Sequence, residues 1–217
     1  MSNPYRAIVF DFDLTLADSS QGFIACHRFA ASQFGLPEPS PTAIAASIGT
    51  PLDIVFTRLY GAKHAGVAEG YIRAYQEYAD RVMTGLTVML PGAVDTVHRL
   101  HSGSLKLGIV SQKLRYRVEE VLRRESLLDC FGVVLGGDDI PAFKPDPRGL
   151  VMAIESLDAR GASLYVGDTT IDAEAARNAN VPFAAVLTGV TKAQEFRTYK
   201  PIAILKSVAG LPDLLGH

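Results

Sequence analysis

The sequence predicts an α/β fold in which a doubly wound parallel sheet carries an inserted helical domain. Three observations predict it. Residues 7–10 form an unbroken apolar run, as in a strand that is buried on both faces of a parallel sheet. From about residue 90 onward, short apolar runs alternate with stretches of helical periodicity, which implies βαβ crossovers. Between these parts, residues 20–84 have helical patterns and no strand signal.

The first strand ends at Asp11, and the helical block begins shortly after it. Serines 19 and 20 offer capping oxygens for the first helix, and a proline-rich break follows that helix. Pro51 suits the first turn of a helix that runs to about Tyr60. The helices expected in this block span residues 21–34, 42–47, 51–60 and 65–83.

The remainder of the chain alternates between helix and strand. We expect helices over residues 93–101, 115–125, 147–157, 172–179 and 207–215. We expect strands over residues 105–110, 133–135, 164–166, 183–187 and 202–205. Right-handed crossovers between such strands cover both faces of the sheet, as in a Rossmann-like core. Residues 1–19 and 85–217 should therefore form the α/β core, and residues 20–84 a separate helical domain.

Composition and charge argue against several classes of function. The chain has 217 residues, of which 48% are apolar and 20% charged, the profile of a soluble globular protein. A net charge of −2 does not favour nucleic acid or an anionic membrane as partner. The N-terminus has no cationic leader followed by an apolar stretch, and no apolar run approaches about eighteen residues. We therefore expect a cytoplasmic protein.

The two cysteines do not indicate a redox or thiolate chemistry. Cys26 and Cys130 form no C-x-x-C pair, so metal–thiolate and disulfide scaffolds are not supported. The sixth residue after each cysteine is not arginine, which excludes a Cys-dependent phosphatase.

Polar residues gather after four of the predicted strands. Because the carboxyl ends of the strands in a doubly wound sheet meet at one edge, these residues point to a ligand there. An EF-hand is excluded for the first acidic pair, because Leu16 and Gly22 occupy the positions that need Gly and Glu. The candidate site residues are Asp11, Asp13, Thr15, Ser111, Gln112, Lys144, Asp168 and Asp172.

The order and spacing of these residues resemble the haloacid dehalogenase-like hydrolase superfamily over nearly the whole chain. Its first motif, D-x-D-x-T, matches Asp11, Asp13 and Thr15, although Leu14 stands where the family usually has Gly. The helical block follows this motif, where one subclass carries a helical cap, as phosphoglycolate phosphatase-like members do. The second and third motifs match Ser111 and Lys144, and the fourth, G-D-x-x-x-D, matches Gly167, Asp168 and Asp172.

The resemblance implies a Mg²⁺-dependent phosphatase for a small phosphomonoester, acting through an aspartyl-phosphate. Asp11 would be the nucleophile, Asp13 the general acid and base, and Lys144 the cation beside the phosphate. Asp13 separates phosphatases from the dehalogenases of the superfamily, which lack this acid because halide leaving needs no proton. The implied metal ligands are Asp11, the backbone carbonyl of Asp13, and Asp168, with Asp172 as support, and the implied phosphate-binding residues are Thr15, Ser111 and Gln112.

Two other functions stay open. A sugar phosphomutase of the same superfamily would use the same groups and return the phosphoryl group to the substrate. A phospho-accepting signalling module also uses an acidic cluster, a hydroxyl and a lysine, but it needs neither Asp13 nor an inserted helical domain. For either enzyme we expect a small phosphorylated metabolite as partner, no nucleic acid or membrane, and a monomer or homodimer.

Overall fold

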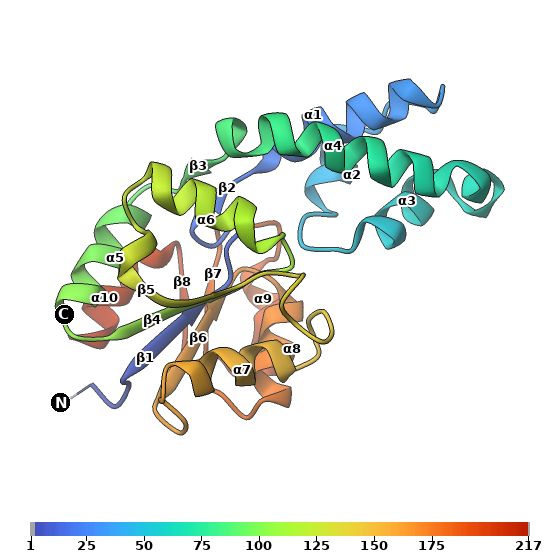
Figure 1. Ribbon diagram of the computed structural model, residues 1–217. Coiled ribbons are helices and arrows are strands. Elements are labelled where there is room, and N and C mark those ends of the chain that lie inside the picture. Colours follow the sequence, from blue (N-terminus) through green and yellow to red (C-terminus); the bar gives the residue numbers. More distant parts are fainter. Residues whose placement is uncertain (1–2, 217) are drawn as a thin grey trace. The chain divides into compact units, whose positions relative to one another are not determined.

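The structure, a computed structural model, describes residues 3–216 and separates into two compact units (Figure 1). The first unit runs up to Ala17 and resumes at Met89, and the second is Asp18–Val88. The domain boundaries expected at residues 20 and 84 lie inside the ends of the second unit. Each unit has its own apolar core.

A six-stranded sheet forms the centre of the first unit, in the order β5-β4-β1-β6-β7-β8 (Figure 1). All neighbouring strands are parallel, so the prediction of a doubly wound parallel sheet is confirmed. In register, Ala7 of β1 pairs with Lys106 of β4 on one side and with Ser163 of β6 on the other. The strands are β1 (Ala7–Phe10), β4 (Lys106–Val110), β5 (Phe131–Leu135), β6 (Ser163–Gly167), β7 (Phe183–Val186) and β8 (Ala203–Leu205).

Helices cover both faces of this sheet (Figure 1). Ile8 and Phe10 of β1 belong to the core beneath α5, α6 and α10, whereas Ala7 and Val9 belong to the core beneath α7, α8 and α9. Alternate residues of a strand point to opposite faces, so one apolar run supplies both cores. The helices are α5 (Ala93–Ser102), α6 (Arg115–Arg124), α7 (Arg148–Ser156), α8 (Thr170–Asn178), α9 (Ala193–Phe196) and α10 (Leu211–Leu215).

Two C-terminal elements differ from the sequence-based expectation. The helix expected over 207–215 is divided into a 3₁₀ turn, Val208–Gly210, and α10. Pro212 favours the first turn of a helix, since it has no N–H to donate, and α10 begins directly before it. The four-residue helix α9 was not expected, because one turn is too short to produce a periodic pattern.

The second unit is helical throughout its interior, as the pattern predicts. It contains α1 (Ser20–Gln33), α2 (Pro41–Ala45), α3 (Leu52–Tyr60) and α4 (Ala68–Leu86), with a 3₁₀ helix over Ala62–Val67 where the start of the last helix was expected. Helices α1 and α4 pack closely: Gly22 of α1 faces Met83 of α4, and a Cβ atom at Gly22 would lie only 2.5 Å from the sulfur of Met83. Inside this core, Nδ1 of His27 lies 2.7 Å from the hydroxyl of Tyr71.

The chain passes between the units through two short paired strands, β2 (Ala17–Asp18) and β3 (Val88–Met89). Two residues are too few for an alternating pattern, so the sequence gives no sign of them. Next to them, the Leu90 amide donates to the carbonyl of Leu16 over 2.9 Å, so the chain leaves the first unit and returns at adjacent points. Across the described residues, none of the helices has the length and apolar character that a membrane span requires.

Candidate functional site

The candidate site lies at the carboxyl edge of the sheet in the first unit. Asp11 and Asp13 follow β1, Ser111 follows β4, and Asp168 follows β6. β1 lies between β4 and β6, so these three strand ends are neighbours. The neighbouring strand ends therefore bring three acids and a hydroxyl together, and all four side chains are buried.

Lys144 holds two of the predicted acids together. Its ammonium group lies 2.6 Å from Asp11 and 2.6 Å from Asp172, and it donates to the hydroxyl of Tyr165 over 3.1 Å. The three oxygen atoms can accept all three ammonium protons. Tyr165 in turn donates to Asp172 over 2.9 Å. Tyr165 was not predicted as a site residue, because an aromatic residue inside an apolar strand is typical of the hydrophobic core.

Asp168 completes a group of three carboxylates with Asp11 and Asp172. Each offers one oxygen atom, and these atoms lie within 4.8 Å of one another. The Thr15 hydroxyl donates to Asp168 over 3.1 Å, and the Thr15 side chain is fully buried. The hydroxyl proton of Thr15 thus orients a carboxylate in this structure, and the binding of phosphate by Thr15 stays a prediction.

Asp172 differs from the other two acids in its hydrogen bonds. One of its oxygens accepts from Lys144 and Tyr165, and the other accepts from the amide and hydroxyl of Thr169, the residue that caps α8. By contrast, among residues 3–216 the Oδ2 atoms of Asp11 and Asp168 accept no hydrogen bond. Asp11 and Asp168 thus have open ligand atoms, whereas both oxygens of Asp172 are occupied.

Asp13 lies in different surroundings from Asp11. Its carboxylate pairs with the ammonium group of Lys113 over 2.9 Å, and the two side chains are only 7% and 4% exposed. The Lys113 amide donates to the hydroxyl oxygen of Ser111 over 3.1 Å, which leaves the proton of that hydroxyl available to a ligand. Lys113 was missed in the sequence, although its position two residues after Ser111 could have suggested it. Gln112 is predicted to bind phosphate. The oxygen of its side-chain amide is buried and has no hydrogen-bond partner within the described part of the chain.

The electrostatics of the site show a shortage of positive charge. Burial raises the pKa of Asp11 to about 7, and repulsion from Asp172 and Asp13 adds to this while Lys144 opposes it. Burial and the charges of Asp11 and Asp172 likewise hold the pKa of Asp168 well above its usual range. For Lys144, desolvation acts to lower the pKa, but the attraction of Asp11 and Asp172 prevails and raises it. Four carboxylates against two ammonium groups favour protons or a cation at this edge.

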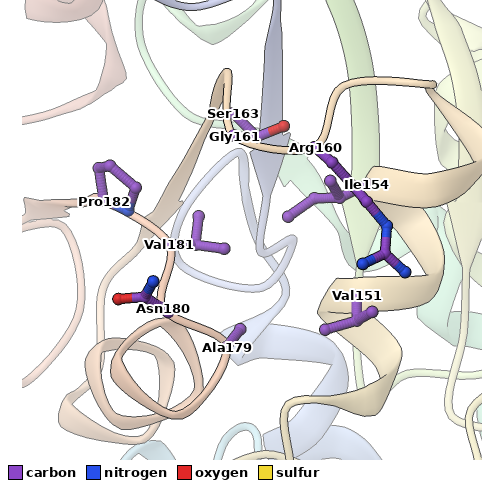
Figure 2. Close-up of a pocket in the computed structure, with 9 residues that line it drawn as sticks. All are labelled: Val151, Ile154, Arg160, Gly161, Ser163, Ala179, Asn180, Val181 and Pro182. Carbon is purple, nitrogen blue, oxygen red and sulfur yellow. The ribbon is translucent and has the colours of Figure 1, made fainter.

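A hollow of about 420 Å³ lies elsewhere in the first unit (Figure 2). Ser163, which lines it, begins β6, whereas Asp168 follows the end of the same strand. Figure 2 shows mostly aliphatic side chains around the hollow and no carboxylate among the labelled residues. The hollow therefore lies at the amino ends of the strands, whereas the acidic group lies at their carboxyl ends.

Comparisons with known proteins agree with the fold and with the motif order. The profile of the haloacid dehalogenase-like hydrolase family matches residues 8–186. A phosphoglycolate phosphatase from Cereibacter sphaeroides is 30% identical over 218 residues, and the match covers 97% of each chain. Pyrophosphatase PpaX from Oceanobacillus iheyensis is 27% identical over 212 residues, again with 97% of each chain covered. The crystal structure of a haloacid dehalogenase-like hydrolase from Bacteroides fragilis has a TM-score of 0.90 and 36% identity, covering 95% of this chain and 99% of that one.

Proposed function

Because the chain belongs to the haloacid dehalogenase-like hydrolase family, we propose that it is a Mg²⁺-dependent phosphatase that hydrolyses a small phosphomonoester through an aspartyl-phosphate. The observation that carries this proposal is that each of two neighbouring acids has its own buried lysine. Asp11 lies against Lys144, and Asp13 lies against Lys113. Double displacement needs two such groups in separate surroundings, one as nucleophile and one as acid and base.

The residues at the site fit a hard divalent cation. We assign Asp11, Asp168 and the backbone carbonyl of Asp13 as ligands, and Asp172 as the residue that orients Lys144 beside them. An all-oxygen donor set favours Mg²⁺ over softer metals. When bound, the cation supplies positive charge that stabilises the nucleophile and the phosphate oxygens.

In the first half-reaction, a carboxylate oxygen of Asp11 attacks phosphorus and the bond to the leaving oxygen breaks. Lys144 reduces the repulsion between the carboxylate and the phosphate, and the Ser111 hydroxyl donates to a phosphate oxygen. Asp13 gives its proton to the leaving oxygen. In the second half-reaction, Asp13 takes a proton from water as that water attacks the phosphorus, which releases phosphate and frees Asp11.

Lys113 suggests which phosphorylated substrates are favoured. Asp13 must lie beside the leaving oxygen, so Lys113, 2.9 Å from Asp13, lies on the leaving-group side. The ammonium group of Lys113 keeps its charge when Asp13 carries its proton, and it can attract a second anionic group on the substrate. The named activities of two relatives, on phosphoglycolate and on pyrophosphate, both involve such a second anion. We therefore put phosphoglycolate first and pyrophosphate second.

A comparison of three substrates tests this function with the full chain. Phosphoglycolate and pyrophosphate carry a second anion, and ethyl phosphate does not. We expect phosphate release to require Mg²⁺ and to stop with excess chelator, and we expect phosphoglycolate to exceed ethyl phosphate in kcat/KM. The substitution Lys113→Gln should reduce that preference by about 10- to 100-fold, the worth of one charged hydrogen bond.

Three results would count against the proposal. Equal rates with and without chelator would contradict the dependence on Mg²⁺. Turnover by Asp11→Asn would contradict the assignment of Asp11 as the nucleophile. Conversion of a sugar phosphate into its isomer, without release of phosphate, would favour the phosphomutase. A cytoplasmic location, a small metabolite as the only partner, and a monomeric or homodimeric state stay predictions.

A further inference from the structure

We propose that the loop after β7, residues 187–192, is a positioning element of the metal-binding site and that it acts through Thr188 and Gly189. The inference rests on the proposed function, because it concerns the residues assigned to hold the cation. The sequence gives little sign of it, since a Thr-Gly pair after a strand is typical of an ordinary loop.

Thr188 fixes the loop that carries the nucleophile. Its hydroxyl donates to the carbonyl of Leu14 over 2.5 Å, although the two residues are 174 positions apart. Leu14 has a φ of +59°, a conformation that side chains other than glycine rarely adopt. Leu14 directly follows Asp13, whose carbonyl is an assigned ligand. The bond from Thr188 therefore holds the turn on which that carbonyl depends.

Gly189 lies against the carboxylate of Asp168. A Cβ atom at Gly189 would lie 1.9 Å from Oδ2 and 2.9 Å from Cγ of Asp168. The φ of Gly189 is not in the left-handed region, so alanine could adopt this backbone. Close approach, and not backbone freedom, is what requires glycine at this position.

The contact at Gly189 determines where the open oxygen of Asp168 points. The other oxygen, Oδ1, is held by the Thr15 hydroxyl, and the side chain is 2% exposed. A methyl group at Gly189 would have to turn Oδ2 away, and Oδ1 would then break its bond with Thr15. Together, Thr188 and Gly189 let one loop set both an assigned backbone ligand and an assigned carboxylate ligand.

The first experiment measures cation binding directly. The purified protein is melted at increasing Mg²⁺, and the Mg²⁺ concentration at which stabilisation begins is recorded, because that concentration is close to the dissociation constant. We expect Gly189→Ala to raise that concentration by about 10- to 100-fold, as for other residues that orient metal ligands. Gly210→Ala is the matched control, because its Cβ would lie an ordinary 3.4 Å from Leu205. The control should match the wild type.

The second experiment guards against a Gly189 variant that does not fold. Thr188→Val keeps the shape of the side chain and removes the donor, whereas Thr188→Ser keeps the donor. We expect stabilisation of the valine variant to begin at a higher Mg²⁺ concentration, and stabilisation of the serine variant to begin at the wild-type concentration. A merely structural role would lower the melting temperature in chelator and leave this Mg²⁺ concentration unchanged.

The outcomes separate the inference from the proposed function. A wild type with no Mg²⁺ shift overturns the proposed function, and the inference with it. A wild type that shifts, together with Gly189→Ala and Thr188→Val variants that shift at the same Mg²⁺ concentration, overturns the inference alone. A raised requirement in the valine variant that serine restores supports it, whether or not the alanine variant folds.

Discussion

At the scale of single residues, Leu14 stands out because it holds a left-handed conformation with a buried side chain. An L-residue in this region costs about 1–2 kcal/mol. The hydrogen bond from the Thr188 hydroxyl to the Leu14 carbonyl stabilises this conformation, and so does the burial of the apolar Leu14 side chain. Glycine would remove the conformational cost but also the burial, so substitution by glycine alone cannot measure the cost.

The comparison of Leu14→Gly with Leu14→Ala does measure it, because both variants lose most of the side chain. We expect the glycine variant to be the more stable by about 1 kcal/mol in denaturant unfolding. At Leu16, which is buried with a negative φ, the order should reverse. If alanine is the more stable substitution at both positions, the turn at Leu14 is not strained.

Asp13 can be tested by separating the two half-reactions. Nitrophenolate leaves without a proton, so Asp13→Asn should barely affect phosphorylation by nitrophenyl phosphate and should slow dephosphorylation by about 10²–10⁴-fold. Rapid mixing should therefore give a burst near one nitrophenolate per site, with a base-labile phosphate on Asp11. Ethyl phosphate, whose leaving group needs the proton, should give no burst. Proportionate slowing of both substrates without phosphoenzyme would mean that Asp13 is not the acid and base.

At the scale of elements, the helical unit has a buried histidine between α1 and α4. Burial lowers the pKa of His27 to about 4, below its usual value near 6.5. Between these two values the unfolded chain binds a proton that the folded protein excludes. The free energy of unfolding should therefore fall as the pH falls from about 6.5 to 4, by up to about 3 kcal/mol from this residue.

The His27→Gln variant isolates this contribution, because glutamine can still hydrogen bond to Tyr71 but does not titrate. Asp11 and Asp168, whose pKa values shift upward, affect both proteins equally and cancel in the comparison. Urea unfolding at pH 7 and pH 5 should show a smaller loss of stability in the variant. The same loss in both proteins would mean that His27 takes up its proton without unfolding.

Also at the scale of elements, the limits of the sequence-based prediction have a physical basis. The parallel strands and the acids at their ends were predictable, because apolar runs and the residues directly after them are local features. Tyr165 was not, because an aromatic residue in an apolar strand is typical of the core. Thr188 was not, and only its position near Ser111 hinted at Lys113, because each of these two acts on a residue that is far away in the chain. Thr188 meets Leu14 across 174 positions and Thr15 meets Asp168 across 153, and no periodic pattern encodes such contacts.

At the scale of the whole molecule, the adjacent crossing points predict that the core can exist without the helical unit. We expect a chain in which a short Gly-Ser linker replaces residues 18–88 to keep a cooperative melting transition and the parallel-sheet circular dichroism. The bond between Leu16 and Leu90 would close the gap. If the helical unit takes part in substrate selection, the ranking of phosphoglycolate over ethyl phosphate should weaken. A shortened chain that aggregates or melts without cooperativity would contradict the independence of the core.

The central position of β1 has a consequence for biosynthesis. Ala7 pairs with Lys106 and Ser163, so β1 leaves the ribosome before its two partner strands, which are translated 99 and 156 residues later. At about 5–20 residues per second, the apolar run of β1 is without a partner strand for roughly 5 s or more. The inserted helical unit accounts for most of that delay. The nascent chain therefore exposes an apolar segment before its partner strands are made. Chaperones that shield this segment should raise the yield of folded enzyme, and they should do so less for the shortened chain that lacks the helical unit.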